Sequence, residues 1–294
     1  MKRVLWSLIW ILTATFAASA QTTFYYPHVV DGVQAGPPAV AWKTTILLTN
    51  PSSSAAASGT IMFTKDNSNL TGAGSAMTLT LTDETGAAAN ASTFNFMIPP
   101  DGTHKLVSSG TGRFQGGFAT VATTAGTVNG TAIFSEFDSA GNLVGEAGVP
   151  SGSAVPNQAI FVDTVGGYAI GVAYANPGTA AANVTLKLLD TAANTVASTT
   201  QVLGSGNHSA GFTFQPQFFP SAPAMSGTMQ ILSSAPLSVI ALRFDPSFSK
   251  FTTLPPVTLA SLINPAIEWL QERPWLTPLS SIARLLGSLQ LRIG

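Results

Sequence analysis

The feature that most constrains this 294-residue chain is a pattern that occurs once in each of its halves. The two versions are GGFATVATTAGTVNGTAIF at residues 116–134 and SGTMQILSSAPLSVIALRF at residues 226–244. Each contains a glycine, an alternating stretch, a small polar turn, a second alternating stretch and a final phenylalanine. Alternation of apolar and polar residues predicts half-buried β-strands. The repeated strand–turn–strand unit therefore indicates a duplicated fold.

Two longer segments extend this repeat toward the start of each half. They are WKTTILLTNPSSSAAASGTIMFT at residues 42–64 and YAIGVAYANPGTAAANVTLKLLD at residues 168–190. In both, an alternating stretch ends in Asn-Pro, at Asn50 and at Asn176. Proline fixes φ and the asparagine side chain can cap a bend, so each Asn-Pro predicts a turn after a strand.

The two copies differ in length between this turn and a later histidine. In each copy a glycine-bearing turn leads to the histidine and a short strand, within residues 99–107 and 203–212. The first copy is longer because of the turn-rich residues 65–90, which include an added strand at Met77 to Leu81. Loops accept insertions more readily than strands. We therefore expect residues 65–92 to be a surface excursion outside the common core.

The remaining pattern is typical of antiparallel β-sandwiches. DSAGNLV at residues 138–144 and DTAANTV at 190–196 have the composition of hairpin turns, with Asp first and Asn late. Each copy has about seven short strands with frequent turn signals, which favours an immunoglobulin-like sandwich. Residues 146–157 have two prolines and no periodicity, and we expect them to be a linker. The fold prediction is all-β, with two tandem antiparallel immunoglobulin-like β-sandwiches at residues 21–150 and 151–255.

The first residues have the pattern of a signal peptide. Lys2 and Arg3 precede an apolar run at residues 4–16, and the small residues 18–20 form a cleavage site. We expect residues 1–20 to be removed, with an uncleaved anchor as the alternative. The run is too short for an ordinary membrane span. The predicted location is secreted, extracellular or on the cell surface, with the periplasm as the alternative.

Composition agrees with an exported β-protein. The chain has no cysteine, so an exported form would depend on core burial rather than on disulfides. Without Lys2 and Arg3, 10 basic residues remain against 13 acidic ones, a net charge of −3. This balance predicts no nucleic-acid partner. Charged residues make up only 9% of the sequence, which is typical of a Thr/Ser-rich surface rather than of a cytoplasmic enzyme.

The last residues, 256–294, change to a composition rich in Leu, Ile, Trp and Arg, and we expect a helical appendage there. Thr277 is the expected N-cap of its clearest helix, with Pro278 in the first turn. The apolar stripe of that helix is Leu279, Ile282, Leu285, Leu286 and Leu289. The helix is too short for a transmembrane span. Docking on the sandwiches or on a partner is one reading, and peripheral membrane contact through the stripe is the other.

Several short segments resemble those of uncharacterised secreted bacterial proteins with paired immunoglobulin-like modules. They are FYYPHVVDG at residues 24–32, TTILLTNPS at 44–52, GEAGVP at 145–150 and FTTLP at 251–255. The resemblance implies export and a β-sandwich fold. It implies no activity and no site residues.

The sequence contains no pattern of a known catalytic or metal site. The histidines His28, His104 and His208 lack the spacing of metal ligands, and no GxSxG is present. We expect His104 and His208 to be surface residues beside turns, equivalent to one another through the duplication. Residues 66–69 are rich in side-chain oxygens but lack the frame of a calcium loop. We therefore expect no catalytic residues, no metal and no cofactor.

The candidate binding residues are aromatic side chains next to prolines. Tyr25 and Tyr26, and likewise Phe218 and Phe219, could form an exposed contact surface. The functional prediction is a non-enzymatic secreted or cell-surface protein with a structural or adhesive role. The alternative is an extracellular glycan- or protein-binding module that is accessory to an enzyme on another chain. The expected partners are extracellular proteins or polysaccharides.

Overall fold

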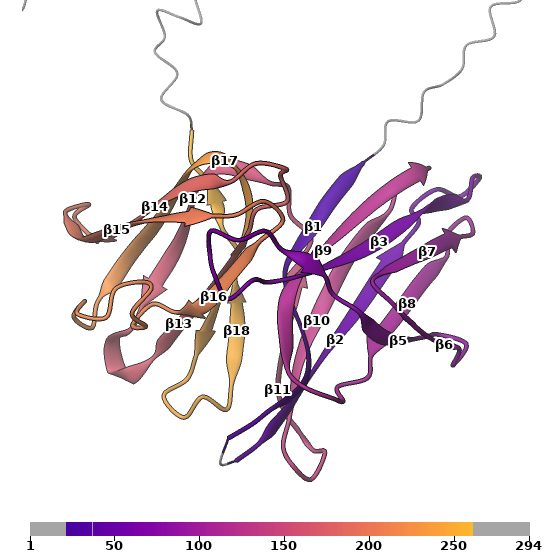
Figure 1. Ribbon diagram of the computed structural model, residues 1–294, viewed down its shortest axis with the longest axis horizontal. Helices are drawn as coiled ribbons and strands as arrows, with labels where there is room; N and C mark the ends of the chain where they lie inside the picture. The colour runs from indigo at the N-terminus through magenta and orange to yellow at the C-terminus, as the bar shows by residue number, and fades with distance from the viewer. Residues whose placement is uncertain (1–21, 37, 261–294) are drawn as a thin grey trace, which may run out of the picture. The chain divides into compact units, whose positions relative to one another are not determined.

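The computed structural model describes residues 22–36 and 38–260, and within these ranges the chain is built of β-strands with no α-helix. The paired strands form antiparallel ladders, so the all-β antiparallel prediction is confirmed (Figure 1). Described residues up to Thr258 belong to one compact unit. The predicted signal peptide and the predicted helices at 265–294 lie outside the described residues. Within those residues, no helix has the length and hydrophobicity needed to cross a membrane.

The first half contains eleven strands. They are β1 (Thr23–Gln34), β2 (Val40–Thr49), β3 (Ala57–Lys65), β4 (Ser75–Ala76), β5 (Leu79–Asp83), β6 (Ala88–Ala91), β7 (Thr93–Ile98), β8 (Thr103–Ser108), β9 (Gln115–Ala125), β10 (Asn129–Phe137) and β11 (Leu143–Pro150). In this half β9 pairs with β1 and β3, whereas β10 pairs with β2 and β11. Strand β3 also pairs with β7, and β2 with β8.

The second half contains eight strands and one short 3-10 turn at Val165–Gly167. The strands are β12 (Val155–Asp163), β13 (Ala169–Ala175), β14 (Ala182–Asp190), β15 (Thr195–Leu203), β16 (His208–Phe212), β17 (Ser226–Phe244), β18 (Phe251–Leu254) and β19 (Val257–Thr258). The first part of β17 pairs with β12 and β14, and its second part with β13 and β18. Strand β14 also pairs with β15, and β13 with β16. The pairing scheme of the first half is therefore repeated, with β17 corresponding to both β9 and β10.

One difference between the halves is that the turn predicted in both copies occurs only in the first. In the first half Gly126 has a positive φ of 69° and separates β9 from β10. The second half has Pro236 in the corresponding region, and the chain continues as one extended strand that changes partners between Ser233 and Ser238. Proline holds φ near −65°, which suits extended backbone and not a left-handed turn residue.

The Asn-Pro turns have the same hydrogen bonds in both halves. Asn50 and Asn176 are fully buried, and each side-chain amide donates to three backbone carbonyl oxygens. Each Oδ1 accepts a bond of 3.0 Å from the backbone nitrogen two residues later. Buried backbone carbonyls need such partners because an unpaired one is costly. The turns predicted at these positions are confirmed.

The two predicted hairpin turns also agree with the structure and share one design. Asp138 connects β10 to β11, and Asp190 connects β14 to β15. The Oδ1 atom of each accepts backbone bonds of 2.9 and 2.8 Å, from the residues two and four positions later. The fourth turn residue has positive φ in both, 85° at Gly141 and 65° at Ala193. Bonds to the following asparagine lower the pKa of both aspartates.

Residues 65–92 contribute to the core, so the prediction of a purely surface excursion is wrong. Met77, Leu79 and Leu81 are at most 3% exposed and belong to the main apolar cluster. Strand β5 pairs with β8 and with β6, which extends the sheet. The alternation of the three apolar residues is that of a strand with one buried face.

The expected linker is also mostly strand. Residues up to Pro150 belong to β11 and those from Val155 to β12, so only residues 151–154 lie between them. Tyr25 and Gly152 exchange two backbone hydrogen bonds of 2.9 Å. The prolines in this segment lie where a strand tolerates them, at the end of β11 and at an irregularity in the pairing of β12 with β17.

The two halves pack on one another over apolar side chains. The larger apolar cluster contains Trp42 and Phe134 of the first half and Leu242, Phe244 and Phe251 of the second. A second apolar cluster lies within the second half. Since a contiguous cluster defines a shared core, the contact between the halves is part of the folded unit.

Close backbone contacts join the halves at a second place. The loop at residues 66–74 lies against the turn at residues 204–207, where Gly204 N donates to Leu70 O at 2.7 Å. A Cβ atom at Gly74 would lie 1.8 Å from the carbonyl oxygen of Gly206. Only glycine fits this approach without movement of the backbone.

Asn207 fills the centre of this second contact. Its Nδ2 atom lies 3.4, 3.2 and 3.0 Å from the carbonyl oxygens of Asn67, Asn69 and Leu70. Its Oδ1 atom accepts a bond of 2.8 Å from the backbone nitrogen of Asn67. Backbone oxygens of the loop at 66–69, which was compared above with a calcium loop, therefore accept hydrogen bonds from the side-chain amide of Asn207 in the second half.

Candidate functional site

The four aromatic residues expected to form a contact surface do not share one. Tyr26, Phe218 and Phe219 are buried, at 0%, 3% and 4% exposure, and only Tyr25 is partly exposed. Burial raises the pKa of the Tyr26 hydroxyl, which has no hydrogen-bond partner within the described part of the chain. Phe218 packs edge-on against Tyr174, inside the core of the second half.

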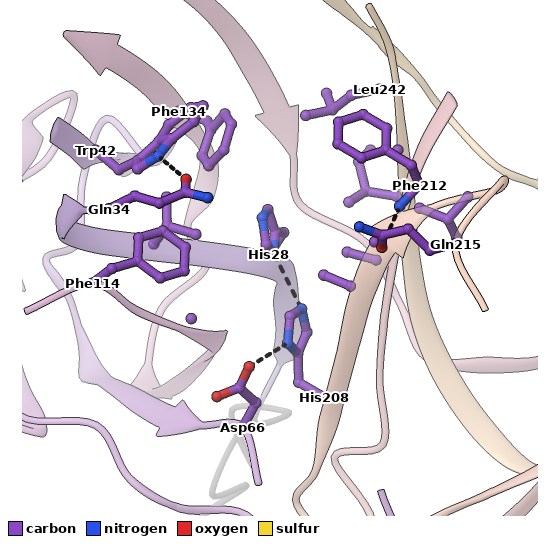
Figure 2. A pocket seen from close by; sticks show the side chains of 18 of the residues that line it. His28, Gln34, Trp42, Asp66, Phe114, Phe134, His208, Phe212, Gln215 and Leu242 are labelled. Atoms are coloured by element: carbon purple, nitrogen blue, oxygen red, sulfur yellow. Dashed lines mark hydrogen bonds and ion pairs between the residues drawn. The ribbon is translucent and has the colours of Figure 1, made fainter. Parts of the chain in front are cut away.

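The structure instead brings together two histidines that lie 180 positions apart. His28 Nδ1 and His208 Nε2 are 3.1 Å apart, and the two rings stack at an interplanar angle of 16° (Figure 2). His208 Nδ1 lies 4.0 Å from Asp66 Oδ2. His208 is 2% exposed, so the expectation of a surface residue is wrong for it. His104 is partly buried and instead contacts Glu84, at 2.9 Å.

Local backbone features position both histidines. His28 lies on β1 between Tyr26 and Val29, where the pairing with β9 changes register. Such bulges turn a side chain out of the regular alternation of a strand. His208 begins β16, and its backbone nitrogen donates to Asn207 Oδ1 at 2.8 Å. The histidine pair therefore depends on the contact that Asn207 makes with the other half.

Burial keeps the imidazole of His28 neutral. Its pKa is lowered to about 3, first by burial and then by the nearby ring of His208. His208 Nδ1 is buried without a hydrogen-bond partner among the described residues, and Asp66 Oδ2 lies 4.0 Å from it. One proton is shared between His28 Nδ1 and His208 Nε2, which leaves His28 Nε2 for a further hydrogen bond.

A cavity of about 290 Å³ lies beside this pair. Its apolar walls come from both halves and include Trp42, Phe134, Val172, Phe212, Leu242 and Phe244. Gln34 Oε1 accepts the indole proton of Trp42 at 2.9 Å, and Gln215 Oε1 accepts the backbone proton of Phe212 at 3.0 Å. These bonds orient both amides, and Figure 2 shows their nitrogens directed into the cavity from opposite sides.

An exposed aromatic group adjoins the cavity. We call Phe212, Phe214 and Phe248 the aromatic surface. The ring of Phe212 stacks on Phe214 at 5.3 Å and 5°, and it meets Phe248 edge-on at 5.3 Å. Phe214 is 52% exposed and Phe248 is 42% exposed. The aromatic surface therefore presents two phenyl rings supported by a third.

The backbone of Phe248 is unusual for a bulky residue. Its φ is +58°, in the left-handed region that residues with large side chains rarely adopt. Asp245 holds the turn, because its Oδ1 accepts bonds of 2.9 Å from the backbone nitrogens of Ser249 and Lys250. Strained backbone of this kind is concentrated at functional sites.

Most side chains that line the described cavity are apolar. The side chains that line the described cavity include no Ser, Thr, Lys or Arg. One imidazole nitrogen of His28 faces one of His208, and within the described residues no cluster of His, Asp and Glu has the composition of a metal site. The region offers aromatic faces, two amide donors and one imidazole nitrogen that is free of His208.

Comparison with known proteins yields no assignment: no protein family matches this chain, and neither does any curated protein.

Sequence reasoning missed this region because its residues come from distant strands. His28 and His208 have no diagnostic spacing, and the phenylalanines of the aromatic surface are separated by turns. One available signal was the run FTFQPQFF at residues 212–219, where four phenylalanines alternate with polar residues and a proline.

Proposed function

We propose that this chain is a non-enzymatic, secreted or cell-surface protein with an adhesive role. In this proposal residues 1–20 are a signal peptide, and residues 21–150 and 151–255 are tandem immunoglobulin-like β-sandwiches. Residues 256–294 are a helical tail. The repeated strand pairings and the paired asparagine turns support the duplication. The resemblance to secreted bacterial proteins with paired immunoglobulin-like modules supports the same reading.

The aromatic surface carries the adhesive part of the proposal. An L-residue in left-handed backbone costs about 1–2 kcal/mol. At Phe248 the fold sustains that strain and still leaves the phenyl ring 42% exposed. Exposed apolar groups that adjoin a cavity commonly mark interaction sites. Contact with another surface through Phe214 and Phe248 would bury the exposed rings.

Glycan binding is the second candidate function. The ring of Phe214 is nearly coplanar with that of Phe212 and is half exposed. A flat aromatic platform of this kind suits stacking on a sugar ring. The chain would then be an extracellular module accessory to an enzyme on another chain.

Retention under flow tests the adhesive function. Beads coated with the protein are passed over the cells that secrete it, and the double variant Phe214→Ser/Phe248→Ser is compared with Phe161→Ser. Phe161 on β12 is a matched control because it is 53% exposed and lies outside the aromatic surface. We expect the double variant to lose retention and the control to keep it.

Equal retention of both variants would contradict the adhesive proposal. The same proteins are applied to a glycan array. Binding to the array that is lost only in the double variant would select the glycan-binding alternative.

A further inference from the structure

We propose that the cavity beside His28 binds a small, neutral, phenolic aromatic molecule that also carries a carbonyl group. This site is separate from adhesion through Phe214 and Phe248, which do not line the cavity. It is formed by both halves and exists only when they are packed together. Each property of the expected ligand follows from a different group of lining residues.

The walls select an aromatic ring. Trp42 and Phe134 stack at 4.7 Å in the first half, and Phe212 meets Phe244 edge-on at 5.1 Å in the second. Offset and edge-to-face contacts with such rings add to the gain from apolar burial. The volume of about 290 Å³ is just below the range of roughly 300–1,000 Å³ for ligand pockets, so it suits a single substituted ring.

Polar atoms on opposite sides define two hydrogen-bonding groups of the ligand. The amide nitrogens of Gln34 and Gln215 are directed into the cavity, because each amide oxygen is already used as an acceptor (Figure 2). Either donor suits a carbonyl oxygen of the ligand. His28 Nδ1 is engaged with His208, which leaves Nε2 for the ligand. A phenolic hydroxyl suits this nitrogen because it can both donate and accept a hydrogen bond.

The charge of the lining favours a neutral ligand. Neither Lys nor Arg lines the described cavity, and the only carboxylate in its lining is Asp66. An anion would therefore find no ionic partner, and Asp66 would repel it. A cation would face the donor hydrogens of the two glutamine amides. Asp66 is already directed at His208, which lies between it and His28 in Figure 2.

Calorimetric titration of the full-length mature protein with 4-hydroxybenzamide at pH 7 tests the proposal. We expect one binding site per chain. Benzamide lacks the hydroxyl and should bind about tenfold more weakly, the usual effect of one hydrogen bond of about 1.4 kcal/mol. In His28→Leu this tenfold preference for the phenol should disappear. The anion 4-hydroxybenzoate and the cation tyramine should each bind at least about tenfold more weakly than 4-hydroxybenzamide.

A blocking variant locates the binding. Ala210 lies on β16, lines the cavity and is exposed, so Ala210→Phe adds a ring to the cavity without entering the core. Ala89→Phe on β6 is the matched control, because Ala89 is also exposed on a strand but does not line the cavity. Binding should be lost in Ala210→Phe and unchanged in Ala89→Phe, with both variants folded by circular dichroism.

Three outcomes would overturn the proposal. One is the absence of measurable heat with 4-hydroxybenzamide at millimolar concentration. Another is unchanged binding in folded Ala210→Phe. The third is tighter binding of the anion or the cation than of the neutral phenol.

Discussion

Replacing Asn207 by alanine should destabilise the whole protein, because this residue connects the two halves. The side chain is fully buried at the contact between the turn at residues 204–207 and the loop at residues 66–74. It accepts bonds from the backbone nitrogens of Asn67 and His208, each 2.8 Å long. It also donates to carbonyl oxygens of the loop.

The expected cost follows from the groups that lose their partners. A typical hydrogen bond contributes about 1 kcal/mol, and a buried group left unpaired costs about 1–3 kcal/mol. Two accepted bonds and one well-formed donated bond at Asn207 then give a loss of roughly 3 kcal/mol in the free energy of unfolding. For a unit of this size, that loss corresponds to a fall of about 6–12 °C in melting temperature.

Urea denaturation followed by circular dichroism measures this loss. Asn69→Ala is the control, because its side chain is exposed and bonds only to Thr71, within its own loop. The control should change the free energy of unfolding by less than about 0.5 kcal/mol. Asn207→Asp keeps the acceptor but directs a carboxylate at carbonyl oxygens, so it should be no more stable than the alanine variant. A cost for Asn207→Ala no larger than that of Asn69→Ala would refute the reasoning.

Three further predictions concern the repeat and the histidine pair. Asn50→Ala and Asn176→Ala should cost the same, roughly 3 kcal/mol each by chemical denaturation, because their hydrogen bonds match; costs that differ by more than about twofold would contradict equivalent turns. Ala193→Gly should stabilise and Gly141→Ala destabilise by roughly 0.5–1 kcal/mol, because both positions have positive φ, and opposite signs in melting temperature check this. Since the pKa of His28 falls to about 3 on folding, the unfolded chain binds a proton that the folded chain does not between pH 6.5 and 3. Stability should therefore fall by about 2 kcal/mol from pH 7 to pH 5, and this part of the pH dependence should be absent in His28→Gln; identical pH profiles of the two proteins would refute it.

The repeated architecture was predictable because it depends on local signals. Asn50 and Asn176 each precede a proline after an alternating run, and both cap the same turn. The hairpins at Asp138 and Asp190 were predictable for the same reason. A turn is determined largely by a few neighbouring residues, so its sequence signature is specific.

The sequence-based predictions were wrong where the local composition hid a strand or a buried face. The polar composition of residues 65–92 obscured the buried alternation of Met77, Leu79 and Leu81. Two prolines concealed strand residues in the expected linker. The expected exposure of Tyr26, Phe218 and Phe219 was wrong, because a proline neighbour says little about whether a side chain is buried.

The cavity was not predictable, because it requires the packing of one half on the other. His28 and His208 meet only when β1 and β16 are brought together, and neither strand contains a pattern that specifies the other. The bulge on β1 that turns His28 toward the cavity is a change of pairing register, and no single residue signals it.

Differential scanning calorimetry of the mature protein tests most directly whether the junction of the halves is a permanent part of the fold. A shared apolar core predicts one cooperative transition over the described residues up to Thr258. At about 0.7 kcal/mol per residue, roughly 240 residues give an unfolding enthalpy of roughly 170 kcal/mol near 60 °C. We expect the van't Hoff enthalpy to equal this calorimetric value. Two transitions, or a van't Hoff enthalpy near half the calorimetric one, would show that the halves unfold separately and would contradict a preformed cavity between them.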